Sequence, residues 1–311
     1  MVPAPTRRAL LLGAGLLGAG ATFLRPTFAH AQATSIADLV DQVRPQTLRQ
    51  HVFGLSAFPT RWTDHPDFPA VEQWVVDAFG ADGAEITRQP YAMPSGKTRH
   101  NIVVGDPSDP REMVLVGAHF DSISQTPAQD APGANDNATG IAALLEAQRI
   151  LAPLNLDRQI VFVAFSGEEQ GLLGSRATAE IAAQEAWPLA LMLNLDMLGF
   201  RPPQPDAPMV IEFDQGNVVP SNDAQARAFG HEAARLAAAH TTLNTTHTDI
   251  WASDYMPFEA RGFPCIGFYD GGAESAFYHT SSDSPDHVDY QRLEQVTRLV
   301  VATLASAGGL T

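Results

Sequence analysis

Residues 161–175 read VFVAFSGEEQGLLGS, a stretch that predicts a buried strand, a tight turn and the start of a helix. Valine and phenylalanine are typical of buried strands, and open α/β sheets bind their ligands at turns that follow the carboxyl ends of strands. The adjacent carboxylates of Glu168 and Glu169 repel each other and are costly to desolvate, and a cation relieves both penalties. We therefore expect one glutamate to bind metal and the other to transfer protons. A solvated Glu-Glu pair remains the simpler explanation of this turn taken alone.

Four further motifs place acidic or histidine side chains just after a predicted strand or at a helix start. They are GAHFDS with His119 and Asp121, GANDNATG with Asp136, NLDMLG with Asp196, and YHTSSD with Tyr278 and His279. A single aspartate in such a place is usually a helix cap or a turn residue. Five such sites at the same kind of strand end are poorly explained in that way. Histidine and carboxylate ligands without cysteine suit zinc and its neighbours, and one bridging carboxylate would allow two metals.

The His-x-Asp spacing of residues 119 and 121 points to a supported metal ligand. Alternate residues of an extended backbone lie on the same side, so both side chains face one region. In the usual arrangement, the carboxylate orients the imidazole and the other ring nitrogen binds the metal.

The composition limits the classes of protein that the chain can represent. With 311 residues, 45% of them hydrophobic and 17% charged, the sequence is typical of a globular protein. The net charge of −16 argues against nucleic acid or an anionic membrane as a partner and suits a site that attracts cations. Cys265 is the single cysteine, so no intrachain disulfide can form, and its apolar surroundings predict a buried, unreactive thiol.

The first 31 residues predict a signal peptide. Arg7 and Arg8 precede a short apolar, glycine-rich stretch, and Ala29-His30-Ala31 resembles a cleavage site. The paired arginines favour the twin-arginine route, with the ordinary secretory route as the alternative. The apolar stretch is too short for a stable membrane anchor. We expect cleavage after Ala31, a catalytic domain over residues 32–311, and a periplasmic or extracellular location.

Predicted strands and helices alternate along the chain, which indicates an α/β fold. We expect a single-domain, three-layer αβα sandwich around a mixed, mostly parallel sheet. Strands are predicted at 85–91, 100–105, 112–117, 158–165, 189–195, 209–213 and 263–268, the first two forming an antiparallel hairpin. Helices are predicted at 36–55 with a break at Pro45, and at 68–79, 136–151, 222–240, 255–260 and 290–305. The segments 201–222 and 241–256 contain loops whose course the sequence does not indicate.

The five motifs, in this order and spacing, resemble those of the co-catalytic zinc aminopeptidases of the MH clan, of the bacterial leucyl aminopeptidase type. The resemblance runs from about Arg61 to the C-terminus. It implies two zinc ions per chain, one bound by His119 and Asp196, the other by Glu169 and His279, with Asp136 bridging them. It further implies that Glu168 is the general base, that Asp121 supports His119, and that Tyr278 stabilises the oxyanion. A cis peptide bond between Asp136 and Asn137 is also expected.

The resemblance implies peptide or protein N-termini as substrates, and we predict a preference for apolar N-terminal residues. Trp251, Tyr255, Phe258 and Phe277 are candidates to line the pocket, or else they pack in the core or at its rim. In one branch of the family, a tyrosine before a Ser-Asp pair assists the oxyanion. Here TDIWA precedes Ser253-Asp254 and supplies none.

Three other functions remain open at this point. A glutaminyl-cyclase-like acyltransferase would use the same fold with one zinc, and a carboxypeptidase or dipeptidase would differ in its loops. A binding module that has lost its metals would require broken motifs, and none is broken here. The sequence does not address the oligomeric state.

Overall fold

Alternation along the central strands divides the apolar core into two parts. In the strand β3 (Met113–His119), Val114, Val116 and Ala118 pack in one part, while Met113 and Leu115 pack in the other. This period of two is the expected geometry of a strand that is buried on both faces. A sheet with helices on both sides therefore lies at the centre of the fold.

The computed structural model describes residues 35–310, except 82, 201, 203, 205, 217 and 272–274. The predicted signal peptide lies outside the described residues. Among the described helices, none is both long and apolar enough to cross a membrane.

Eight strands form one mixed sheet in the order β1-β2-β4-β3-β5-β8-β6-β7. Besides β3 they are β1 (Ile86–Ala92), β2 (Thr98–Val104), β4 (Gln159–Phe165), β5 (Leu189–Asp196), β6 (Met209–Phe213), β7 (Thr245–Thr248) and β8 (Cys265–Tyr269). Strands β4, β3, β5 and β8 run parallel, and the hairpin β1-β2 is antiparallel at one edge, as the sequence predicted. β7 was not predicted, and it pairs with β6 at the opposite edge.

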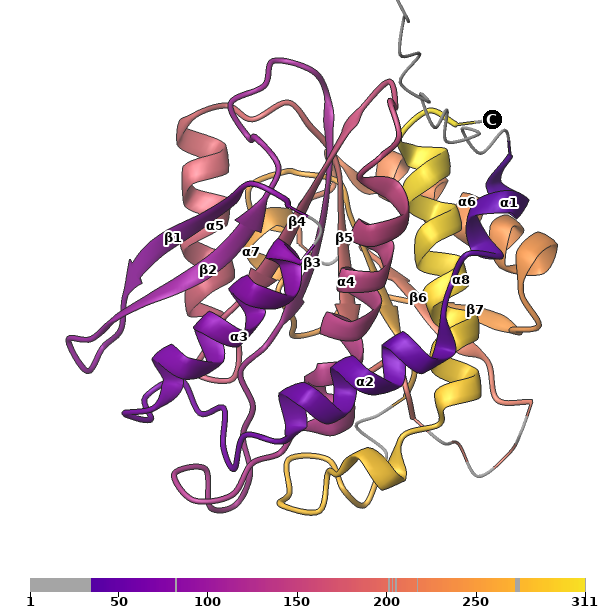
Figure 1. The fold of residues 1–311 in the computed structure, drawn as a ribbon. Helices are drawn as coiled ribbons and strands as arrows, with labels where there is room; N and C mark the ends of the chain where they lie inside the picture. Colours follow the sequence, from indigo (N-terminus) through magenta and orange to yellow (C-terminus); the bar gives the residue numbers. More distant parts are fainter. Residues whose placement is uncertain are drawn as a thin grey trace, which may run out of the picture. The chain divides into compact units, whose positions relative to one another are not determined.

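Helices cover both faces of the sheet (Figure 1). One core contains residues of α1 (Ile36–Val40), α2 (Pro45–Ser56), α3 (Phe68–Gly80), α4 (Thr139–Leu151), α6 (Asp223–His240) and α8 (Tyr290–Ala307). The other contains residues of α5 (Leu173–Gln184) and α7 (Met256–Glu259). The predicted α/β sandwich is confirmed. The break at Pro45 separates α1 from α2, because proline is tolerated in the first turn of a helix but not in its interior.

The parallel strands bring three of the predicted motifs to the same edge of the sheet. β3 ends at His119, β5 ends at Asp196, and β4 ends at Phe165, three residues before Glu168. A kinked turn, η1 (Ala134–Ala138), whose backbone is not helical at Asp136 and Asn137, precedes α4 and carries Asp136. The carboxyl ends of parallel strands are where such sheets place their ligand sites.

Candidate metal centre

The structure brings together all five residues expected to bind metal. Ligand atoms of His119, Asp136 and Asp196 lie within 4.8 Å of one another, and so do those of Asp136, Glu169 and His279. Asp136 belongs to both groups. The two groups therefore form one centre that shares a carboxylate.

Asp136 lies between the two histidines. Its Oδ1 is 3.2 Å from Nε2 of His119, and its Oδ2 is 3.2 Å from Nε2 of His279. Nε2 of His119 also lies 3.5 Å from Oδ1 of Asp196, and Nε2 of His279 lies 3.1 Å from Oε2 of Glu169. Each half of the centre therefore has one histidine and one carboxylate of its own, as the resemblance implied.

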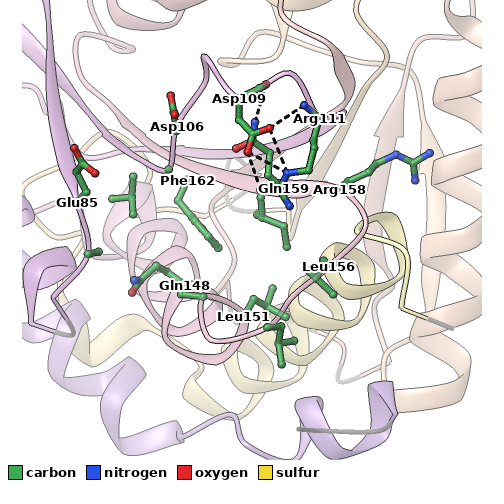
Figure 2. Close-up of a pocket in the computed structure, with 16 residues that line it drawn as sticks. Glu85, Asp106, Asp109, Arg111, Gln148, Leu151, Leu156, Arg158, Gln159 and Phe162 are labelled. Carbon is green, nitrogen blue, oxygen red and sulfur yellow. Dashed lines mark hydrogen bonds and ion pairs between the residues drawn. The ribbon is translucent and has the colours of Figure 1, made fainter.

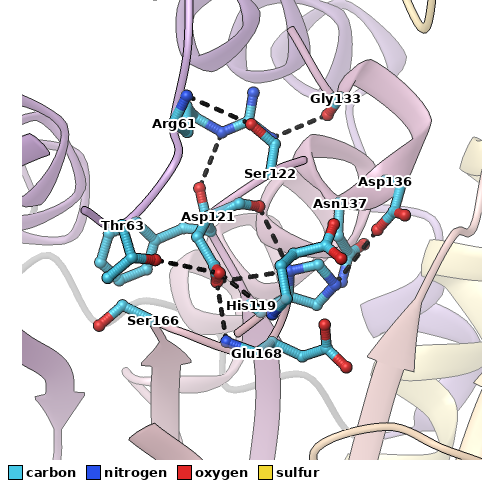
Figure 3. A network of polar contacts seen from close by, with 12 residues as sticks. Arg61, Thr63, His119, Asp121, Ser122, Gly133, Asp136, Asn137, Ser166 and Glu168 are labelled. Atoms are coloured by element: carbon cyan, nitrogen blue, oxygen red, sulfur yellow. Dashed lines mark hydrogen bonds and ion pairs between the residues drawn. The ribbon is translucent and has the colours of Figure 1, made fainter. Parts of the chain in front are cut away.

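Asp121 holds the turn that carries the two glutamates (Figure 3). Its carboxylate accepts the backbone N–H groups of Glu168 and Glu169, each at 3.2 Å, and the hydroxyl of Thr63 at 3.1 Å. Oδ1 of Asp121 lies 3.7 Å from Nδ1 of His119, whereas the backbone carbonyl oxygen of Asp121 lies 3.3 Å from the same nitrogen. The closer contact on the imidazole therefore comes from the main chain of Asp121, and its carboxylate chiefly fixes the turn.

Glycine at position 167 lets this turn pack closely against Tyr91 of the β1-β2 hairpin. Gly167 has a φ of +73°, and a Cβ atom there would meet the hydroxyl oxygen of Tyr91 at 2.6 Å. That hydroxyl lies 2.9 Å from Oγ of Ser166. A larger residue at position 167 would therefore displace the turn and its glutamates.

Several residues that support the centre were not assigned a role from the sequence. The carboxylate of Asp283 accepts the backbone N–H groups of Asn135 at 2.9 Å and Asp136 at 3.0 Å. The hydroxyl of Ser253 donates to Oδ2 of Asp196 at 2.7 Å. Asp283 ends the motif YHTSSD and Ser253 belongs to the noted Ser-Asp pair, so both were visible as motif residues without a function.

Arg61 and Asn137 fix the backbone on either side of Asp136. Arg61 is fully buried and donates to the carbonyls of Phe120 at 2.7 Å and Gly133 at 2.8 Å, and to that of Pro132. Asn137 donates to the carbonyl of Leu195 at 2.9 Å, which ties η1 to β5. The expected cis peptide bond between Asp136 and Asn137 is present.

The electrostatic state of the centre follows from buried acids beside two histidines. Burial alone would lower the pKa of His279, but contacts with Asp136 and Glu169 raise it to about 10. Burial and the charge of Asp136 raise the pKa of Glu169 to about 7. Burial, opposed by His119, also raises the pKa of Glu168 well above its ordinary value. The protein without metal therefore holds protons here, and a metal would replace them.

Asp254 is a further buried acid beside the centre. It is fully buried, and burial raises the pKa of its carboxyl to about 7, against the opposing effect of His119. The nearby charges of Asp121 and Asp196 add to this increase. Asp254 therefore belongs to the charged surroundings of the centre, although the resemblance assigned it no role.

A pocket opens beside the centre. It is lined by Glu168, Glu169, Tyr278 and His279, and by the side chains of Met197, Glu212, Trp251, Tyr255 and Tyr269. Two of the aromatic residues considered for a pocket, Trp251 and Tyr255, therefore line it. Phe258 instead packs in the core, and Phe277 stacks on His287 with ring centroids 3.7 Å apart.

A second hollow lies near the ends where β3 and β4 begin (Figure 2). Its two arginines pair with acids: Arg111 with Asp109 at 2.8 Å, and Arg158 with Glu112 at 2.8 Å. None of the described residues that line it is a histidine. This hollow therefore lacks the combination of histidines and carboxylates found beside Asp136.

Comparison with known proteins agrees with this geometry. A sequence model of peptidase family M28 matches residues 101–304, a range that contains all the expected metal ligands. The chain belongs to peptidase family M28. This M28 chain is similar to aminopeptidase YwaD of Bacillus subtilis, with 31% identity over 248 residues that make up 75% of this chain and 51% of that protein. The chain thus spans about half the length of this curated relative.

Solved structures share the fold of this M28 chain. The aminopeptidase LapA of Legionella pneumophila matches with a TM-score of 0.76 at 18% identity, over 88% of this chain and 74% of that chain. A glutaminyl cyclase of Bacteroides thetaiotaomicron matches with a TM-score of 0.70 at 18% identity, over 85% of this chain and 98% of that chain. At such identities the likeness shows the fold alone, and the M28 fold accommodates both kinds of protein.

The donor atoms of this M28 chain suit a bound metal. Oε1 of Glu169 and Oδ1 of Asp196 are buried, and neither accepts a well-formed hydrogen bond from the described part of the chain. Buried carboxylate oxygens without donors are costly, and metal ligation removes that cost. Histidine nitrogens together with carboxylate oxygens are the donors that zinc prefers.

Proposed function

We propose that the chain is a zinc-dependent aminopeptidase that removes N-terminal residues from peptides. The observation that carries this proposal is the position of Asp136 between His119 and His279, each with its own carboxylate partner. This arrangement fits two metal ions that share one carboxylate. The family membership supports peptide hydrolysis, and the relative YwaD supports an N-terminal site of cleavage.

His119 and Asp196 would hold one zinc ion, and Glu169 and His279 the other, with Asp136 as the shared ligand. When bound, the metals supply Lewis-acid activation of the scissile carbonyl and of the attacking water. The buried, donor-free oxygens of Glu169 and Asp196 support this assignment.

Glu168 would act as the general base. Its ligand atom lies within 4.8 Å of those of His119 and Glu169, and Asp121 fixes its backbone. Glu168 is not one of the five proposed ligands. Its carboxylate is therefore free to take a proton from the attacking water and pass it to the leaving amine. Burial raises the pKa of Glu168, which makes it a better proton acceptor once it is ionised.

Tyr278 would stabilise the oxyanion. It lines the pocket next to His279, and its ring stacks on the imidazole of His279 with centroids 3.7 Å apart. Burial and the neighbouring carboxylates raise its pKa above the ordinary value of tyrosine, so the hydroxyl stays protonated and can donate. A donor directed at developing negative charge lowers the barrier of acyl transfer.

The pocket favours a substrate with a free ammonium group and an apolar side chain. The acidic groups around Asp136 attract a cation, and Met197, Trp251 and Tyr269 supply apolar and aromatic surface. The substrate class would then be peptide or protein N-termini with apolar first residues. We further propose that residues 1–31 direct export and that the mature enzyme acts in the periplasm or outside the cell.

The shared fold keeps a glutaminyl-cyclase-like acyltransferase as the second candidate. That reaction would need one zinc ion, whereas the chain presents two histidines and three carboxylates in two overlapping groups. Metal analysis separates the two proposals, since two zinc ions per chain favour the hydrolase. It would also reveal cobalt or manganese in place of zinc.

The direct test is hydrolysis of leucine para-nitroanilide beside its N-acetyl derivative, with and without a zinc chelator. We expect cleavage of the free-amine substrate only, and loss of that cleavage with the chelator. If neither substrate is cut but two zinc ions are bound, a carboxypeptidase or dipeptidase becomes the better proposal. If neither is cut and only one zinc ion is bound, the cyclase does.

A further inference from the structure

A second group of carboxylates lies outside the candidate metal centre. Asp214 follows β6 directly, Asp223 is the first residue of α6, and Glu259 is the last residue of α7. One carboxylate oxygen of each lies within 4.8 Å of those of the other two. Three segments of the chain thus bring three acids to one point.

Oxygen atoms in this group lack hydrogen-bond donors. Glu259 is fully buried, and within the described part of the chain neither of its oxygens has a donor in hydrogen-bonding geometry. The same holds for Oδ1 of Asp223 and for Oδ1 of Asn222, the residue that precedes α6. The side chain of Asn222 lies close enough to Glu259 to lower its pKa, whereas Asp214 raises it. Four buried acceptor oxygens therefore need a partner that accepts their lone pairs.

The turn after β6 fixes the third carboxylate. Oδ1 of Asp214 accepts the backbone N–H group of Gly216 at 2.8 Å, and Oδ2 accepts those of Val218 at 3.1 Å and Val219 at 3.2 Å. Hydrogen bonds from backbone amides favour the ionised form of a carboxylate. These hydrogen bonds therefore fix the carboxylate of Asp214 in place beside Glu259.

Among the ion pairs of the described residues, none involves Asp223 or Glu259. Burial, together with the charges of Asp214 and Asp223, raises the pKa of Glu259 to about 7. Like charges at short range are stable only if one acid is protonated or a cation joins them. Either a proton or a metal ion must therefore occupy the space between these acids.

We propose that Asp214, Asp223 and Glu259 bind a calcium ion. All three donors are carboxylate oxygens, which is the ligand set of a hard divalent cation. The thiol of Cys265 also lies near Glu259. Burial, and to a smaller extent the charge of Glu259, raises the pKa of this thiol, so it stays protonated. The ion would link the end of β6 to the start of α6 and to the end of α7, and it would stabilise that part of the fold.

The site can be tested by the calcium content of the full chain, independently of peptidase activity. The protein is freed of calcium by passage over a chelating resin, reloaded with zinc, and dialysed against free calcium on the order of 1 mM, where weak structural sites fill. We expect one calcium ion per chain and a rise of a few degrees in Tm. Magnesium at the same concentration should give a smaller shift.

Matched variants locate the bound ion. Glu259→Gln and Asp223→Asn keep the shape of each side chain and should abolish both the bound calcium and the shift in Tm. Glu180→Gln, on an exposed acid, and Asp136→Asn, in the other centre, should retain them. Far-ultraviolet circular dichroism checks that the variants fold. If Glu259→Gln does not fold, the calcium content of Asp223→Asn and of the wild type decides whether the site exists.

Three results would overturn the proposal. They are no calcium on the wild-type chain at that concentration, equal calcium on the wild type and on a folded Glu259→Gln or Asp223→Asn variant, and tighter binding of magnesium. The first would indicate a proton shared between Glu259 and Asp214. Because the readout is bound calcium, the outcome is independent of whether the chain is an aminopeptidase.

Discussion

Oδ1 of Asp121 accepts the backbone N–H group of Glu168 at 3.2 Å. Oδ2 of Asp121 does the same for the next residue, Glu169, also at 3.2 Å. One buried carboxylate at the end of β3 thereby fixes the proposed base and a proposed metal ligand on the turn after β4. The two neighbouring parallel strands set this geometry, because their carboxyl ends lie side by side.

Asp121→Asn should lower activity without unfolding the protein. An amide has one acceptor oxygen, so the N–H group of Glu168 or Glu169 would lose its partner. We expect kcat/KM on leucine para-nitroanilide to fall by about 10–100-fold at saturating zinc, the usual cost of losing such support. Asp77→Asn, on the exposed side of α3, is the control. Unchanged kinetics in Asp121→Asn would show that the turn holds its geometry without this carboxylate.

Glu168→Gln should separate catalysis from metal binding. Glutamine cannot accept the proton of the attacking water, so we expect kcat to fall by roughly 10²–10⁴-fold while zinc content stays at the wild-type level. Asp136→Asn is the contrasting variant, because it removes charge from the ligand that lies between both histidines, and it should lose zinc as well as activity. Full activity of Glu168→Gln would exclude the assigned general base.

The sheet could be predicted where strands are buried and apolar. The run VFVAF and the segment 189–195 gave clear strand patterns, and both are central strands. β7 could not be predicted in this way, because its four residues, Thr-Thr-His-Thr, are polar and lie at an edge. An edge strand buries little apolar surface, so its sequence carries little periodic signal.

The proposed metal ligands could be picked out from the sequence because each lies in a short motif that follows a predicted strand or opens a predicted helix. The residues that support them act across long separations in sequence. Asp283 accepts the backbone N–H group of Asp136, from which it is separated by 147 positions in sequence. Ser253 donates to Asp196, from which it is separated by 57 positions. Aspartate and serine are common in turns for local reasons. Only the folded chain therefore distinguishes these two from ordinary turn residues.

Tyr278→Phe tests the proposed oxyanion donor. Phenylalanine keeps the ring that stacks on His279 and removes only the hydroxyl. Loss of a donor that acts in the transition state should lower kcat by about 10²–10³-fold and leave KM nearly unchanged. Tyr290→Phe, on α8 and not among the described residues that line the pocket, serves as the control. An equal loss in both variants, or no loss in Tyr278→Phe, would leave the metals as the source of this stabilisation.

Glu212→Gln should change the pH dependence of stability. Glu212 is buried beside the pocket, and Tyr255 donates a hydrogen bond to its Oε2 at 2.8 Å. Burial raises the pKa of Glu212 from 4.5 to about 7, against the opposing effect of that hydrogen bond. The folded state therefore binds a proton that the unfolded state releases between these values. The contribution of Glu212 to stability is fully present below pH 4.5 and is lost as the pH rises through 7.

Glutamine carries no charge at any pH and can still accept the hydrogen bond from Tyr255, so Glu212→Gln should avoid this loss. Relative to the wild type, its free energy of unfolding should be similar at pH 4 and higher at pH 8 by on the order of 3 kcal/mol. Urea unfolding at both pH values, with zinc held constant, measures the difference. Glu112→Gln, at an exposed acid, should show no such change between the two pH values. A constant offset between Glu212→Gln and the wild type at both pH values would mean that Glu212 does not titrate in this range, and that Tyr255 holds it as an anion throughout.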